Sequence, residues 1–368
     1  MAGVLSGLKI VEMAGLGPAP FCAMLLADHG AQVIRIARPG QISPLPLPPD
    51  RDVLNRGRET LTLDLKTEPD RTTLRALIAH ADALIEGFRP GTMEKLGFGP
   101  EAAAALNPRL VYGRMTGWGQ SGPLSQRAGH DLNYAALSGV IAAIGDPSLP
   151  PPPPLNLVAD FGGGAMFLAF GLLAAMLEAQ RSGQGQVVDA AMVDGSALLM
   201  SLMHSLYAAD AWSLERSANL LDGGTPFYAC YATLDDKYLV VCPLEPQFYA
   251  ALLDRLGLKD DPAFARQYDK STWPAMRARL TTIFAARPRA DWETLFEGSD
   301  ACVTPVLNMA EAPAHAHNAA RKNFVDVEGI TQSAPAPRFS RSAAPPPSPV
   351  LVTPASAEKI LARWQTKA

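Results

Sequence analysis

Alternating strand and helix patterns near the start of the chain constrain the fold more than any other feature of the sequence. An apolar stretch at residues 8–14 is followed by a glycine-rich turn at residues 15–18, a helical stretch that ends near His29 and a second apolar stretch at residues 31–37. A short apolar run beside a turn is typical of a buried strand. The opening therefore predicts a βαβ unit.

The same alternation continues further along the chain. Residues 71–80 have a helical pattern, and apolar strand patterns flank it at residues 61–65, 82–88 and 109–115. Strands that alternate with helices favour a parallel sheet, because each connection must cross over the sheet before the next strand begins. We therefore expect an α/β fold with a Rossmann-like, mainly parallel sheet.

The second half of the chain has a different pattern. Residues 162–183 and 189–210 are long apolar segments that predict helices too apolar for an exposed surface. After Asn219 come short strand patterns at residues 227–233 and 237–243, followed by amphipathic helices. Because a chain of 368 residues exceeds the size at which a single core keeps growing, we expect a smaller α+β domain here.

The composition argues against several classes of function. The net charge is −4 and charged residues make up 18% of the chain, so neither nucleic acid nor a membrane surface is an expected partner. No apolar segment approaches the roughly 20 residues that span a bilayer, and an export signal is not evident. The cysteines lack a C-x-x-C pair, which argues against a zinc site or a disulfide framework; they are Cys22, Cys230, Cys242 and Cys302. We expect reduced thiols, no bound metal and a cytoplasmic location.

Basic residues recur after the predicted strands. The first turn has Gly15, Gly17 and Pro20, a dinucleotide fingerprint with proline in place of its third glycine. Arg38 ends the second strand, where a nicotinamide-binding chain carries an acidic residue. Taken alone, Arg38 fits a solvated residue equally well. Together with the other basic residues, Arg38 predicts a positively charged rim around a binding site for a polyanionic adenine nucleotide. The other residues are Arg56, Arg58, Lys66 and Arg89.

A glycine-rich loop at residues 114–129 leads to His130 and Asp131, at the start of a predicted helix that includes Tyr134. Asp131 fits a helix cap, which is a common use of aspartate at this position. The imidazole of His130 can exchange protons near neutral pH, and the glycines let a substrate approach it. A lone histidine is usually structural, so both interpretations of His130 stay open at this point.

Asp160 comes shortly before three glycines at residues 162–164, which open the long apolar helix. One interpretation is that Asp160 only caps this helix, a contribution of about 1 kcal/mol. The other is that its carboxylate faces a substrate while the amides of Gly162 and Gly163 hold an oxyanion, because bare backbone allows a ligand to come close.

Glu245 follows the apolar strand of the predicted small domain, between two prolines. A carboxylate at the end of a buried strand is well placed to hold an imidazole nitrogen. The residues alone favour the simpler interpretation, an acidic residue in a strand-end turn.

Taken in order, the motifs resemble one family along nearly the whole chain. They are GLGPAP, ARPG, FRPG, RMTGWGQSGP, GHDLNY, ADFGGG, GQGQVVDAAMVDG and LEPQF. The set resembles the class III CoA-transferases, also called the carnitine dehydratase and bile-acid-inducible family, and within it the members that racemise 2-methylacyl-CoA thioesters. The resemblance thins after Pro335, and the proline run Pro150 to Pro154 is longer than the family pattern needs.

The resemblance implies an interlocked homodimer, with each active site between the large domain of one subunit and the small domain of the other. It matches the CoA-binding arginines of the family to Arg38 and Arg89. The implied domains are residues 1–190 with 325–368 (large, Rossmann-like and CoA-binding), 191–222 (linker helices) and 223–324 (small domain).

The resemblance also implies the chemistry. His130 and Asp160 match the two proton carriers, and Glu245 matches a glutamate from the partner's small domain that pairs with the histidine. One base removes the proton next to the thioester and the conjugate acid of the other returns a proton to the opposite face. Asp131 and Glu245 are expected to orient the imidazole. No metal, flavin or nicotinamide is required, and CoA enters as part of the substrate.

Other functions would use the same residues differently. In a class III CoA-transferase, the Asp160 carboxylate would accept the acyl group as a nucleophile, and His130 would not be needed as a second proton carrier. A nicotinamide-dependent oxidoreductase conflicts with Pro20 and Arg38. A non-catalytic CoA-binding module conflicts with the joint presence of His130, Asp160 and Glu245. The sequence favours an isomerase, with the transferase as the alternative.

Overall fold

The computed structural model describes residues 3–41 and 46–365, and the chain divides into two compact units. The first unit contains three segments: Met1–Gly139, Pro154–Met200 and Ala316–Ala368. The second contains two: Val140–Pro153 and Ser201–His315. Compared with the ranges expected from the sequence, the second unit also takes in residues 140–153 and 201–222, and the first also takes in residues 191–200 and 316–324.

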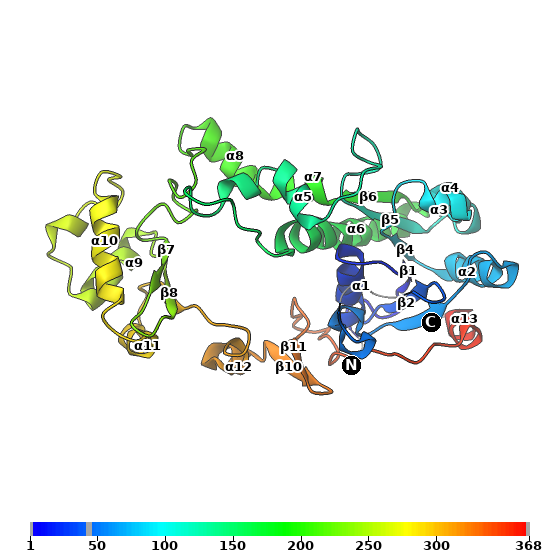
Figure 1. The fold of residues 1–368 in the computed structure, drawn as a ribbon. Coiled ribbons are helices and arrows are strands. Elements are labelled where there is room, and N and C mark those ends of the chain that lie inside the picture. Colours follow the sequence, from blue (N-terminus) through cyan, green and yellow to red (C-terminus); the bar gives the residue numbers. More distant parts are fainter. Residues whose placement is uncertain (1–2, 42–45, 366–368) are drawn as a thin grey trace. The chain divides into compact units, whose positions relative to one another are not determined.

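A six-stranded parallel sheet forms the centre of the first unit (Figure 1). Its strand order is β3-β2-β1-β4-β5-β6, and every neighbouring pair is parallel. The predicted α/β fold with a parallel sheet is therefore confirmed. The strands are β1 (Lys9–Met13), β2 (Gln32–Ala37), β3 (Glu59–Thr62), β4 (Ala83–Glu86), β5 (Val111–Thr116) and β6 (Val187–Ala191).

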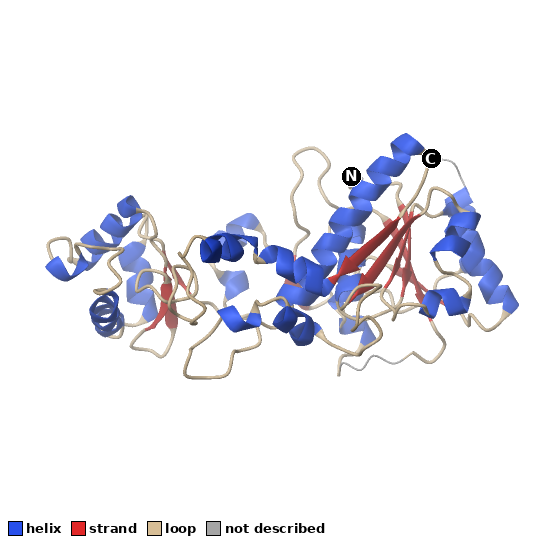
Figure 2. Cartoon of the chain, turned by 90° about the horizontal axis from the view of Figure 1, so that it is seen from above, coloured by secondary structure: helices blue, strands red, loops and turns tan. Residues whose placement is uncertain are grey.

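Helices cover both faces of this sheet, as Figure 2 shows with the strands in red. Helix α1 (Pro18–Asp28) packs against α6 (Met166–Ser182), which packs on β5 and β6. Helix α2 (Glu68–His80) and the C-terminal helix α13 (Ala357–Gln365) share another core, in which Leu77 meets Trp364 and residues of the sheet. The remaining elements of this unit are α3 (Thr92–Leu96), α4 (Pro100–Leu106), α5 (Asp131–Leu137), α7 (Met192–Leu199), α12 (Ala316–Arg321) and the hairpin β10 (Phe324–Val327) with β11 (Ile330–Ser333).

Two predicted helices begin elsewhere. The segment predicted as one helix over residues 189–210 is instead β6, α7 and then α8 (Ser201–Ala208). The prediction was wrong because β6 obtains its hydrogen bonds from β5, far away in sequence, and its few residues merge with the apolar helix that follows. The helix predicted from residue 162 begins earlier, with a π-helical stretch at Leu157–Ala165 that continues directly into α6.

The continuous helix Leu157–Ser182 is long and apolar enough to cross a membrane by length and composition, with a mean hydropathy of 1.8. The expectation that no apolar segment approaches this length was wrong. A core helix of a folded domain passes the same test. Here Leu168, Leu172 and Met176 are buried, and the helix packs on the sheet.

The second unit has a small antiparallel sheet of three strands, β7 (Ala229–Ala232), β8 (Tyr238–Val241) and β9 (Val303–Pro305), in the order β7-β8-β9. The two predicted strands correspond to β7 and β8. Their buried side chains, such as Tyr231 and Leu239, join a core with the helices α9 (Pro246–Leu256), α10 (Trp273–Phe284) and α11 (Arg289–Phe296).

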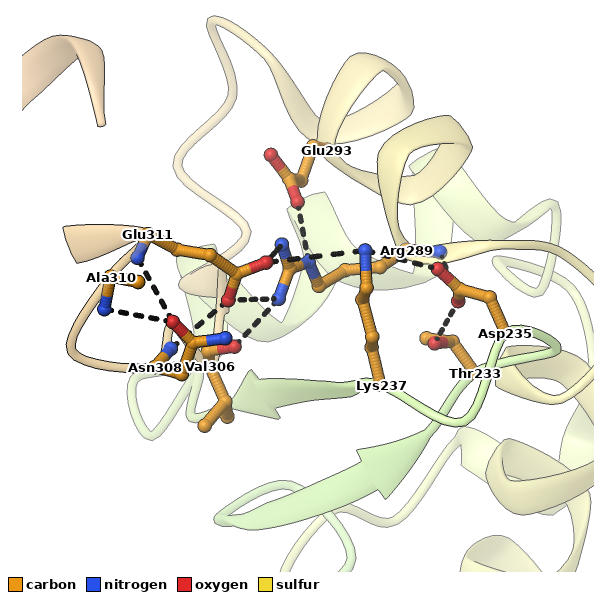
Figure 3. Close-up of polar contacts among 9 residues, drawn as sticks. All are labelled: Thr233, Asp235, Lys237, Arg289, Glu293, Val306, Asn308, Ala310 and Glu311. Carbon is orange, nitrogen blue, oxygen red and sulfur yellow. Dashed lines mark hydrogen bonds and ion pairs between the residues drawn. The ribbon is translucent and has the colours of Figure 1, made fainter. Parts of the chain in front are cut away.

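Arg289 ties β9 and the loop after it to α11 (Figure 3). Its Nη2 atom donates to the Glu311 carboxylate at 2.7 Å, its Nη1 atom to the Val306 carbonyl at 2.8 Å, and its Nε atom to Glu293 at 2.9 Å. The hydrogen bond from Arg289 lowers the pKa of the Glu311 carboxyl to about 2. This network fixes the position of β9 in the small sheet.

Candidate active site

The strand order reverses beside β1, because β2 and β3 lie on one side of it and β4, β5 and β6 on the other. Open α/β sheets bind ligands at the carboxyl ends of the strands, at such a switch point. Two cavities lie there, a small cavity of about 260 Å³ and a large cavity of about 590 Å³. Phe88, which follows β4, lines both of them.

The small cavity brings together three residues that the sequence singled out: Arg89, His130 and Tyr134. They come from the loop after β4 and from the start of α5. His130 is exposed, and its backbone N–H donates to the Asn133 side chain at 3.0 Å, which fixes the first turn of α5.

The buried ring of Tyr134 forms one wall of the small cavity. It meets the Trp118 ring edge to face, with centroids 4.7 Å apart. A Cβ at Gly117 would lie 2.0 Å from an atom of the tyrosine ring, and one at Gly129 would lie 2.7 Å away. Both positions need glycine because the ring occupies the space of a side chain.

Asp160 lies next to the turn that follows β1. Its Oδ2 atom is 2.9 Å from where a Cβ of Gly17 would stand. Leu16 and Pro18, on either side of that glycine, line the small cavity. The amide of Asn156 donates to the same carboxylate oxygen at 3.1 Å. The aspartate is therefore held at the edge of the cavity that contains His130.

Burial and neighbouring charges also change the pKa values of Asp160 and Tyr134. Burial raises the pKa of the Asp160 carboxyl; the hydrogen bond from Asn156 lowers it, the charge of Asp131 raises it and the charge of His130 lowers it. Burial raises the pKa of the Tyr134 hydroxyl, and the charge of Asp160 raises it further. Because such effects fall off with distance, Asp160 lies within electrostatic range of both His130 and Tyr134.

Asp131 has a different role from the predicted one. Its Oδ1 atom accepts hydrogen bonds from the N–H groups of Ala159, at 3.0 Å, and Asp160, at 2.7 Å. These N–H groups lie in the first turn of the helix that begins at Leu157, where the helix supplies no acceptor. The prediction that Asp131 orients the imidazole is corrected: its carboxylate caps a helix distant in sequence and positions the backbone of Asp160.

Gly162 and Gly163 also differ from expectation. Their amides lie inside the π-helical stretch, in which each N–H after the first turn donates to the carbonyl five residues earlier, so they are not free first-turn donors. Gly163 is buried against α7: a Cβ there would lie 2.6 Å from the backbone nitrogen of Ser196, and a Cβ at Gly195 would lie 1.8 Å from the Gly163 carbonyl oxygen. The prediction that these amides hold an oxyanion is corrected, since the glycines serve a close helix contact.

Replacing Gly195 by alanine is expected to destabilise the protein by about 1–3 kcal/mol, because a backbone carbonyl cannot move aside as a side chain can. The free energy of unfolding in denaturant measures this. Gly15→Ala is the matched control, since the nearest atom to its new Cβ would be 3.9 Å away. Equal losses in the two variants would contradict the assigned contact.

The large cavity is lined by residues that follow β1, β2 and β3. Arg38 and Lys66, both predicted to bind a nucleotide, contribute exposed side chains to it. The backbone N–H of Arg38 donates to the Gln41 side chain at 3.3 Å, which shapes the loop after β2. Two exposed cations beside one cavity favour an anionic ligand there.

Arg58 and Arg56 are not part of that rim. The side chains of Arg58 and Glu12 are fully buried, and the Arg58 Nη1 atom donates to the glutamate at 2.6 Å. Arg56 makes a similar buried pair with Asp28 at 2.6 Å. The structure corrects the prediction. A basic residue near a strand looks the same in sequence whether it faces solvent or pairs with a carboxylate on a neighbouring element.

Glu245 belongs to the second unit, immediately before α9. Its carbonyl accepts hydrogen bonds from the N–H groups of Phe248 and Tyr249, and its side chain is exposed. The carboxylate is thus open to a partner, and its pairing with an imidazole of a second subunit stays a prediction.

Three further residues of the site were missed from the sequence. Trp118 and Arg127 line the small cavity, and Asn156 holds the Asp160 carboxylate. Asn156 and Asp160 are four residues apart, about one helical turn. This spacing would have predicted their contact if the helix had been predicted to begin before Gly162.

Similarity to known proteins assigns the chain to a family. CoA-transferase family III matches residues 5–355. The chain belongs to this family. Alpha-methylacyl-CoA racemase of Mus musculus is 46% identical over 344 residues, which are 93% of this chain and 88% of that protein. Alpha-methylacyl-CoA racemase of Homo sapiens is 44% identical over 352 residues, which are 95% of this chain and 87% of that protein.

The family III fold is also found among solved structures. A CaiB/BaiF family protein from Brucella suis superposes with a TM-score of 0.82 at 25% identity, covering 99% of this chain and 100% of that one. The resemblance noted from the motifs is therefore confirmed along the chain.

Proposed function

We propose that this family III protein is an isomerase that racemises 2-methylacyl-CoA thioesters. The observation that supports the proposal is that His130 lines the small cavity while Asp160 lies beside Gly17, in the turn that contributes to the same cavity. The identity of 46% with the mouse racemase supports the same activity.

Two proton carriers account for inversion at the carbon next to the thioester. The imidazole of His130 removes the proton from one face and leaves an enolate, and the carboxylic acid of Asp160 returns a proton to the other face. Burial raises the pKa of the Asp160 carboxyl, so its protonated form persists to higher pH than in an ordinary aspartate. That suits a group which both gives and takes a proton. The steps need no metal, flavin or nicotinamide.

We expect the CoA part of the substrate to bind in the large cavity. Arg38 and Lys66 offer positive charge for its phosphates, and the thioester would extend past Phe88 into the small cavity. Arg89, in the small cavity, stands beside the reacting end.

Arg38→Ala is expected to raise KM for the acyl-CoA about 10-fold while kcat changes little, because the nucleotide end is remote from the chemistry. Steady-state kinetics on one thioester measures both constants. Arg109→Ala is the matched control. This arginine is exposed and lies before β5, at the amino ends of the parallel strands, whereas Arg38 lies at their carboxyl ends. An unchanged KM in Arg38→Ala would remove Arg38 from the binding site.

CoA transfer is the rival function, because the family takes its name from that reaction. A transferase would use the Asp160 carboxylate as a nucleophile that carries the acyl group. The presence of His130 at the same cavity favours the racemase, since a transferase has no use for a second proton carrier there.

We expect the protein to act as a homodimer in the cytoplasm, with Glu245 of one subunit beside the histidine of the other. All four cysteines are free thiols, which fits a reducing compartment. A second copy would also cover apolar side chains that lie along one face of α6 and are exposed in the single chain, Met166, Phe170, Leu173 and Leu177.

Phe170→Glu is expected to shift the protein from dimer to monomer, because it puts a charge in the middle of that apolar face. Light scattering coupled to size exclusion measures the mass. Phe170 is 72% exposed in the single chain, and Met309, an isolated methionine that is 94% exposed, offers the control Met309→Glu. A monomeric wild type would contradict the expected dimer.

A further inference from the structure

Cys230, Cys242 and Cys302 lie within or beside the strands of the small sheet, although Cys302 is far from the other two in sequence. Cys230 lies on β7 opposite Val240 of β8, and Cys242 comes two residues later. Successive side chains of a strand point to opposite faces, and Val241, between the last two, is fully buried in the core. Cys230 and Cys242 therefore lie on the face away from that core, where Cys230 is exposed and Cys242 half-buried.

Cys242 directly follows β8 and Cys302 directly precedes β9, so the two cysteines lie side by side at one end of this strand pair. Val241 of β8 pairs with Val303 of β9, and the N–H of Cys242 donates to the carbonyl of Cys302 at 3.0 Å, which extends the ladder by one pair. The Sγ atom of Cys242 lies 3.4 Å from the same carbonyl oxygen. Cys302 has a positive φ and its own Sγ atom lies 3.7 Å from the Asp300 carbonyl oxygen, so this side chain must rotate toward Cys242 to form a disulfide.

We propose that Cys242 and Cys302 form a dithiol site that a hydroperoxide oxidises to an intrachain disulfide. One thiolate attacks the peroxide oxygen and becomes a sulfenic acid, with release of the alcohol or water. The second thiol then attacks the sulfenic sulfur, which forms the S–S bond and releases water. The two thiols lose two electrons and two protons, and these reduce the peroxide.

The position of the site connects it to Glu245. This residue follows Cys242 by three positions in the sequence and begins α9. Burial raises the pKa of both thiols, and the charge of Glu245 contributes to the increase at Cys302, so the reactive thiolate and hence the oxidation are favoured by higher pH. A disulfide would restrain the connection that carries Glu245. This consequence rests on the proposed function, whereas the oxidation itself does not.

Treating the full-length protein with hydrogen peroxide, alkylating the remaining thiols and mapping the peptides by mass spectrometry tests the site. We expect a linked pair of peptides containing Cys242 and Cys302 in the wild type. The same pair should form in Cys230→Ser, because Cys230 lies diagonally from Cys242 and too far for a disulfide. Wild type in which Cys242 and Cys302 are both still alkylated, while Cys230 is oxidised, would overturn the proposal.

The consequence for activity is measured on the same samples. Peroxide is expected to lower racemisation by the wild type, with recovery after reduction by dithiothreitol, and to leave Cys302→Ser unaffected. A disulfide that forms without any change in rate would overturn the connection to Glu245. An inactive wild type before oxidation would contradict the proposed function instead, so the two failures are distinguishable.

Discussion

His130→Ala is expected to lower the rate of inversion of a 2-methylacyl-CoA by about 10²–10⁴-fold, the range typical for loss of a positioned acid or base. The variant loses the carrier on one face, while Asp160 remains on the other. Exchange of the α-proton from the Asp160 face is therefore expected to survive in part, even though inversion is lost. Polarimetry and mass spectrometry in deuterated water measure the two processes separately.

The control for this experiment is His80→Ala. His80 is exposed at the end of α2, before β4 begins. It therefore lies at the amino ends of the parallel strands, whereas the site lies at their carboxyl ends. CoA exchange with a panel of carboxylic acids is assayed in parallel. Efficient acyl transfer that survives in His130→Ala would assign the protein to the transferases, because that reaction needs Asp160 as a nucleophile and leaves the histidine idle.

Arg58→Ala is expected to cost about 3–5 kcal/mol of the free energy of unfolding, because it leaves the Glu12 carboxylate buried without its partner. Denaturant unfolding measures this loss. Arg51→Ala is the matched control, since Arg51 is 50% exposed and lies 3.8 Å from Asp50. A pair of that kind contributes about 0–1 kcal/mol.

The double variant Arg58→Leu with Glu12→Leu separates two explanations of the loss. If the unpaired charge causes it, the double variant should recover much of the stability, because apolar groups of similar size can replace a buried pair. If Arg58→Ala had the same free energy of unfolding as wild type, the result would contradict the assignment of a buried Arg58–Glu12 pair.

Much of the sheet could be predicted from the sequence because its central strands are buried on both faces. Val11 of β1 and Leu84 of β4 are fully buried, and the residues around them are mainly apolar, although Glu12 interrupts the apolar run of β1. Strand β6 was missed since only its pairing with β5 makes it a strand. Strand β9, Val303–Pro305, is too short to leave a pattern.

The sequence could predict those residues of the candidate site that lie in loops directly after strands. Arg89 and His130 were found because loops at the carboxyl edge of a parallel sheet carry the chemistry, and their side-chain types are distinctive. The roles of Asp131, Arg58 and Gly163 were assigned wrongly, because each depends on a partner distant in sequence: the start of another helix, a carboxylate on β1 and a glycine on α7.

Incubating the protein with one enantiomer of a 2-methylacyl-CoA in deuterated water, with no acceptor acid present, tests the central claim most directly. The proposed racemase is expected to scramble the configuration at C2 and to introduce one deuterium there, because the returned proton comes from solvent through His130 or Asp160. Retained configuration and no deuterium at C2, together with transfer of CoA once a carboxylic acid is added, would contradict it.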